Sequence, residues 1–129
     1  MTYIDKRPLS PHLTIHKKMQ TAVLSLMHRI TGVGLSLGSI VLVFFLFSIA
    51  MGENFYNIIF YLFSLLIFKI LLFCWSFSIF FHLINGLRYL VWSLGYGMNL
   101  KNIYSSGHLV IFISFSINII IWLKILKIV

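Results

Sequence analysis

The sequence predicts an all-α integral membrane protein, with three transmembrane helices preceded by a polar N-terminal arm. The chain has 129 residues, of which 60% are hydrophobic and only 9% are charged. Soluble domains average about 45–50% apolar and about 25% charged residues. The apolar residues gather into three stretches that are long enough to cross a hydrocarbon core of about 30 Å. The single cysteine, Cys74, excludes an internal disulfide and a cysteine-based metal site.

The N-terminal segment, residues 1–21, is polar and basic, and Pro8 and Pro11 disfavour a helix within it. It has no apolar stretch of the kind that signal peptides contain. We expect a surface arm here, followed by a transmembrane domain over residues 22–129. The spans within that domain are expected at about 22–51, 58–94 and 107–129.

Glycine-containing turns separate the three expected spans. Residues 30–51 carry no charge, and Gly52 follows them. As one helix the stretch 58–94 would exceed about 50 Å at 1.5 Å per residue, so we expect it to protrude or to begin in the interface. A polar loop is expected from Gly95 to Gly107, before the third span.

The basic residues predict the orientation, because lysine and arginine favour the cytoplasmic or matrix side of a membrane. Ten basic residues against two acids give a net charge of +8. In a membrane chain this excess indicates topology and contact with anionic lipid rather than nucleic-acid binding. The first loop has no lysine or arginine, and only two lysines follow the third span, so the N-terminus is expected on the matrix or cytoplasmic side. The residues that predict this are Lys6, Arg7, Lys17, Lys18, Arg29, Arg88 and Lys101.

Polar residues within the spans are candidates for function, since ionisable groups in a membrane are costly. Ser78, His82 and Gly86 share one face of the second span at i, i+4 and i+8. An imidazole nitrogen is a good axial ligand of haem iron, although a membrane histidine more often hydrogen-bonds a neighbouring helix. Spacing alone leaves both interpretations open.

The antiparallel order of the first two spans places two histidines and two arginines at similar depth near the inner side. Such a cluster suits an anionic cofactor, because guanidinium groups pair with carboxylates through bidentate hydrogen bonds. We therefore count Arg88 among the cofactor-binding candidates. The four residues are His28, Arg29, His82 and Arg88.

Two further patterns predict helix packing. Gly34-x-x-x-Gly38 would allow a neighbouring helix to approach closely. Ser114 and Asn118 lie one turn apart in the third span and are expected to hydrogen-bond across helices.

Three further motifs occur in order along the chain. The first is RPLSPHLTI at 7–15, and the second is S-x-x-H-R-x-x-G at 25–32. The third is H-x-x-N-G-x-R-x-x-x-W-x-x-G at 82–95. Together they cover about residues 7–97, and they resemble the cytochrome b membrane-anchor subunit of succinate dehydrogenase (complex II). The chain differs from the family pattern at Tyr89 and Ser93, where the family commonly has His and Asp.

The resemblance implies a role in a larger complex. The subunit would pair with a second small anchor subunit, and the two would hold the iron–sulfur subunit and, indirectly, the flavoprotein at the membrane. One haem b would lie between the anchors, with His82 as an axial ligand of its iron and with His28 and Arg29 near its propionates. Ser25 and Arg29 would help to form the ubiquinone site. Succinate oxidation would belong to the flavoprotein, so no catalytic residue for succinate is expected in this chain.

Three other interpretations remain open from the sequence. The chain could be a structural anchor without haem, or the cytochrome subunit of a fumarate reductase, which would share the architecture. A more remote alternative is a small transporter subunit, which would need charged residues along a path across the membrane.

Overall fold

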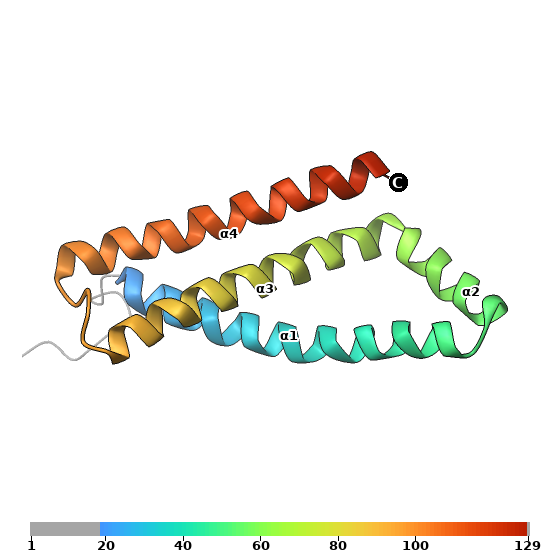
Figure 1. The fold of residues 1–129 in the computed structure, drawn as a ribbon, viewed down its shortest axis with the longest axis horizontal. Helices are drawn as coiled ribbons and strands as arrows, with labels where there is room; N and C mark the ends of the chain where they lie inside the picture. Colours follow the sequence, from blue (N-terminus) through green and yellow to red (C-terminus); the bar gives the residue numbers. More distant parts are fainter. Residues whose placement is uncertain (1–18, 129) are drawn as a thin grey trace, which may run out of the picture.

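The computed structural model describes residues 19–128, so the expected N-terminal arm lies almost entirely outside the described residues. The described chain forms four helices, α1 (Gln20–Ala50), α2 (Glu53–Ser64), α3 (Leu66–Ser93) and α4 (Leu100–Ile128) (Figure 1). Three of them, α1, α3 and α4, are long and apolar enough to cross a membrane. These observations confirm the predicted all-α fold with three spans.

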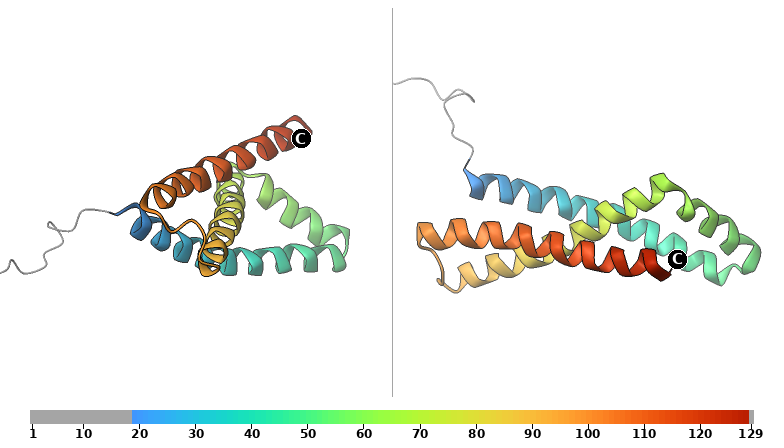
Figure 2. Two further views of the ribbon diagram at one scale, coloured as in Figure 1. Left: turned by 60° about the vertical axis from the view of Figure 1, so that its left-hand side comes forward. Right: turned by 90° about the horizontal axis from the view of Figure 1, so that it is seen from above.

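Helix α3 contacts both α1 and α4. It lies between them in Figure 1, and seen from above it crosses α1 (Figure 2, right). The first turns of α1, the last turns of α3 and the first turns of α4 meet at one end of the molecule, which we call the histidine end. There α1 also contacts α4, because Gly107 has no side chain. A Cβ at position 107 would lie 2.8 Å from both Gln20 Nε2 and Leu24 Cδ1.

The apolar core is at the histidine end and takes one residue from each long helix. Leu24 of α1, Phe81 of α3 and Val110 of α4 are 1%, 0% and 3% exposed. Most other apolar side chains face outward, as expected of helices that a membrane or a partner chain covers. The histidine end is therefore the best-packed part of the described chain.

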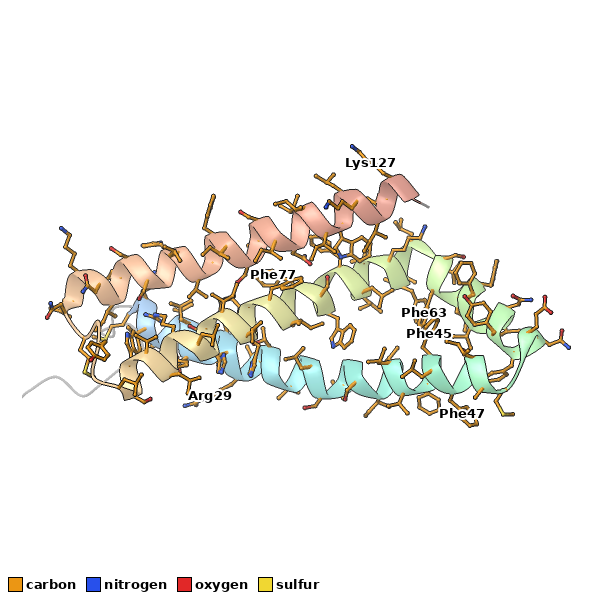
Figure 3. The ribbon with its side chains drawn as sticks, viewed as in Figure 1. Arg29, Phe45, Phe47, Phe63, Phe77 and Lys127 are labelled. Carbon is orange, nitrogen blue, oxygen red and sulfur yellow. The ribbon has the colours of Figure 1, made fainter. Side chains whose placement is uncertain are left out.

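The apolar stretch 58–94 is broken at Leu65, which corrects the expectation of one long helix. Leu65 has extended backbone angles (φ −64°, ψ 142°) and caps both α2 and α3. The Ser64 hydroxyl donates to a carbonyl oxygen one turn earlier, at 2.6 Å, a bond that competes with regular helix geometry. On the N-terminal side of the break, α2 runs back towards the end of α1. There Phe63 packs against Phe45, with ring centroids 5.5 Å apart (Figure 3).

The turns contain the only positive-φ residues of residues 19–128, all glycines. Gly52 (φ 97°) joins α1 to α2, and Gly95 (φ 82°) and Gly97 (φ 74°) join α3 to α4, where glycine adopts the left-handed conformation without steric cost. The second turn is shorter than expected. Helix α4 begins at Leu100 and not after a polar loop that ends at Gly107, because polar residues at a membrane interface can be solvated while they remain helical.

Small residues of α1 allow α3 to approach, as the Gly34/Gly38 pattern predicts. A Cβ at position 38 would overlap the indole of Trp75. At position 34 a Cβ would make only an ordinary contact, 3.8 Å from Ser78 Oγ. The face of α3 that carries Ser78 therefore packs against α1.

A polar network joins α3 to α4 in the other half of the bundle. Ser76 Oγ donates to Asn118 Oδ1 at 2.7 Å, and Trp122 Nε1 donates to Ser76 Oγ at 2.9 Å. The interhelical bond expected of Asn118 is thus confirmed. The expectation for Ser114 is wrong, because its hydroxyl donates to the carbonyl oxygen of Val110 in its own helix.

Candidate functional site

Two histidines from different helices stack at the histidine end. The imidazole rings of His28 in α1 and His82 in α3 have centroids 3.8 Å apart and planes 9° apart. Gly32 makes room for this arrangement, because a Cβ there would lie 3.1 Å from His82 Cε1. Gly86 lies beside the His28 ring, where a Cβ would be 3.7 Å from His28 Cε1. Gly32 and Gly86 thus leave room for the two stacked imidazole rings between α1 and α3.

The hydrogen-bond partners of His82 define which of its two ring nitrogens carries the hydrogen. Its Nδ1 lies 3.1 Å from the main-chain carbonyl oxygen of His28. A carbonyl oxygen only accepts hydrogen bonds, so Nδ1 is the protonated nitrogen in the neutral ring. The lone pair is then on Nε2, which has no hydrogen-bond partner among residues 19–128 and is not among their buried unpaired atoms. His82 therefore presents one open nitrogen donor.

The partly buried His28 ring has aromatic neighbours on α3. Tyr89 meets it edge-on at 5.4 Å between centroids, and Trp92 meets Tyr89 edge-on at 5.5 Å. His28 Nδ1 is buried and has no hydrogen-bond partner within the described part of the chain. Tyr89 thus supplies an aromatic wall for His28.

Arg88 faces α4 rather than the two histidines. Its guanidinium donates to Ser106 Oγ and to the carbonyl oxygen of Ile103, both at 2.9 Å, and more weakly to Asn85 Oδ1 at 3.4 Å. It also lies 4.0 Å from the centroid of the Trp92 ring, at a distance typical of a cation–π contact. Only 7% exposed, Arg88 holds the last turns of α3 against the first turns of α4.

The other sequence-predicted residues lie on α1. Ser25 is partly buried and Arg29 is exposed, and Figure 3 shows Arg29 on the side of the bundle away from α4. The structure thus brings His28 and His82 together, while the two arginines point to different surroundings. Ser25 and Arg29 lie one turn apart on α1, and Arg29 is accessible to a partner chain.

Sequence reasoning missed Thr31, which is 7% exposed and lies within 3.3 Å of His82 Nδ1. The signal available in the sequence was its position three residues after His28, which is one helical turn. No group of three His, Cys, Asp or Glu side chains that could hold a bare metal ion is present within residues 19–128. The site offers the Nε2 nitrogen of His82, with the His28 ring stacked beside it.

Comparisons with known proteins identify the family of this chain. Residues 4–121 match the family described as succinate dehydrogenase/fumarate reductase transmembrane subunit. The chain is 38% identical over 118 residues to the succinate dehydrogenase cytochrome b556 subunit of Rickettsia prowazekii, covering 92% of each chain. It is 38% identical over 130 residues to the succinate dehydrogenase cytochrome b560 subunit of Reclinomonas americana, covering 91% of this chain and 85% of the relative. A mouse relative is named as the mitochondrial cytochrome b560 subunit and is 36% identical over 107 residues, 80% of this chain and 62% of its own length. The chain therefore belongs to the transmembrane-subunit family of succinate dehydrogenase and fumarate reductase, and is an integral membrane protein.

Proposed function

We propose that this chain is the haem b-binding membrane anchor of a succinate:ubiquinone oxidoreductase and helps to form its ubiquinone-reduction site. Its partners would be a second small anchor subunit, the iron–sulfur subunit and, indirectly, the flavoprotein. The names of the relatives support this role, since they are cytochrome b subunits of succinate dehydrogenase.

The observation that carries the proposal is the open Nε2 of His82. The bond from Nδ1 to the His28 carbonyl oxygen, at 3.1 Å, fixes both the tautomer and the ring orientation. Axial histidines of haem iron commonly have their second nitrogen held in this way. The residues present therefore fit a haem, with His82 as one axial ligand. When bound, haem b supplies one-electron redox chemistry.

The second axial ligand is expected from the partner anchor. The His28 and His82 rings are stacked, with their planes 9° apart, so His28 would not supply a second nitrogen ligand to the iron that His82 would hold. His28 is instead a candidate donor to a propionate through its Nε2, which has no hydrogen-bond partner among the described residues and is not one of their buried unpaired atoms.

Arg29 and Ser25 are proposed to serve the anionic and quinone groups. Arg29 is exposed on α1 and can donate two parallel hydrogen bonds to a carboxylate, or stabilise negative charge on a quinone oxygen. The Ser25 hydroxyl can donate to a quinone carbonyl oxygen. Arg88 already donates to three protein oxygens, so it fits a structural clamp better than a propionate contact.

The positions of the charges argue against a transporter. Lys69 lies in the first turn of α3, and Arg88 lies in its last two turns. No Asp, Glu, Lys or Arg occupies the middle third of α1, α3 or α4. The described helices thus provide no charged path across the membrane.

Purification of the complex, with identification of its subunits and a reduced-minus-oxidised spectrum, tests the proposal. We expect the flavoprotein, the iron–sulfur subunit and a second anchor to copurify, together with a b-type absorption band. A complex with these subunits and no b-type band would favour the haem-less anchor and overturn the haem assignment. Recovery of the chain without the flavoprotein and iron–sulfur subunits would contradict the anchor role itself.

A further inference from the structure

Thr31 and the main chain of His28 converge on the same nitrogen of His82. The Thr31 hydroxyl donates to the carbonyl oxygen of His28 at 2.9 Å. The same hydroxyl oxygen lies 3.3 Å from His82 Nδ1, which is itself 3.1 Å from that carbonyl oxygen. Three polar atoms thus form a closed triangle between α1 and α3.

Only one proton arrangement satisfies this triangle. A hydroxyl has one hydrogen to donate and two lone pairs, and a carbonyl oxygen can accept two hydrogen bonds. Because the Thr31 hydrogen points at the carbonyl oxygen, its lone pairs remain for a donor. His82 Nδ1 therefore carries a hydrogen, and this N–H donates to both the Thr31 oxygen and the His28 carbonyl oxygen.

Packing prevents the His82 ring from leaving this position. Thr31 is 7% exposed, so water does not readily replace its hydroxyl. Gly32 lies against one edge of the ring, where even a Cβ would be only 3.1 Å from Cε1. The His28 ring covers a face of His82 at 3.8 Å.

We propose that Thr31 is a positioning residue that, together with the His28 carbonyl oxygen, holds His82 as its Nδ1-protonated tautomer and aims Nε2 at the haem iron. This inference rests on the proposed function, in which His82 ligates haem. Acceptors on Nδ1–H make the opposite nitrogen a more basic ligand. More basic ligands favour oxidised iron, so Thr31 lowers the midpoint potential of the haem.

The test compares Thr31→Val with Thr31→Ser in the whole complex, by haem content and by redox titration of the b-type band. Thr31→Val keeps the shape and removes the hydroxyl. We expect it to shift the midpoint potential to a more positive value and to weaken haem retention by roughly tenfold, at the lower end of what is typical for such outer partners. Thr31→Ser restores the hydroxyl and should return both values to those of the unaltered complex.

Ser48→Ala is the matched control. The Ser48 hydroxyl is also buried in α1 and donates to the carbonyl oxygen three residues earlier, at 2.6 Å, but it lies far from both histidines. We expect Ser48→Ala to leave the potential unchanged. If Thr31→Val does not assemble, Thr31→Cys keeps the volume with only a weak acceptor, and the same positive shift is expected.

Two results separate failure of this inference from failure of the proposed function. An unchanged potential and unchanged haem content in the assembled hydroxyl-deficient variant overturn the role of Thr31 and leave haem ligation standing. A complex without a b-type band before any substitution overturns both.

Discussion

The imidazole rings of His28 and His82 stack at 3.8 Å between centroids, with their planes 9° apart. The stack joins the first span to the second at the end of the bundle where the apolar core lies. His28 makes two separate contacts with His82. Its ring stacks on the His82 ring, and its main-chain carbonyl oxygen accepts a hydrogen bond from His82 Nδ1. Substitution of the His28 side chain removes only the first.

His28→Ala is therefore expected to weaken haem retention without removing the b-type band. The stacked pair alone contributes about 0.5–1.5 kcal/mol beyond the area that it buries, and the proposed hydrogen bond to a propionate adds to this, so retention should fall at least roughly twofold. The haem-to-flavin ratio of the purified complex measures this loss. Complete disappearance of the band in His28→Ala would instead place His28 on the iron.

The two glycines of the G-x-x-x-G pattern should differ sharply on substitution. Gly38→Ala puts a Cβ into the indole of Trp75, and such overpacking typically costs about 1–3 kcal/mol. Gly34→Ala adds an ordinary contact at 3.8 Å and favours the helix, so it should be neutral or slightly stabilising. Thermal denaturation of the solubilised complex compares the two. Equal stability of the two variants would refute the close approach at Gly38.

Arg88→Gln tests whether Arg88 is a clamp between α3 and α4. Hydrogen bonds from a charged group are worth about 1.5–3 kcal/mol each, so loss of the guanidinium should lower thermal stability and expose residues 94–99 to proteolysis. The haem band should keep its position and intensity in the fraction that assembles. Lys101→Gln, which removes an exposed charge from the first turns of α4, serves as the control. Loss of haem at unchanged stability would place Arg88 at a propionate.

The sequence predicts the spans and the histidine pair because both depend on local pattern. Apolar length predicts a membrane helix, and antiparallel order brings His28 and His82 to one depth. Depth alone does not specify the face of a helix. Arg88 follows His82 by six residues, which at about 100° per residue places it about 120° around α3, and there it contacts α4.

The break at Leu65 could not be predicted from its own residues. Neither Gly nor Pro is present there, and the preceding Ser64 is common in membrane helices. The break is accompanied by a tertiary contact, in which Phe63 of α2 packs against Phe45 of α1. The contact of Thr31 with His82 is tertiary in the same sense, because it depends on how closely α1 and α3 approach.

Ser25→Ala tests the quinone site. Loss of one hydrogen bond of about 1 kcal/mol should lower kcat/KM for ubiquinone roughly fivefold, while reduction of a soluble dye acceptor by succinate stays unchanged. Ser39→Ala is a suitable control. The exposed Ser39 hydroxyl donates to the carbonyl oxygen of Ser36, and Ser39 lies about 21 Å from Ser25 along α1. Normal ubiquinone kinetics and inhibitor sensitivity in Ser25→Ala would remove Ser25 from the site.

Haem ligation by His82 is tested most directly by the reduced-minus-oxidised spectrum of the purified His82→Ala complex. His108→Ala is the control, because His108 is an exposed histidine at the same end of the bundle. We predict that the b-type band is lost in His82→Ala and retained in His108→Ala, with the flavoprotein and iron–sulfur subunits still bound in both. A b-type band of full intensity in His82→Ala would contradict the account.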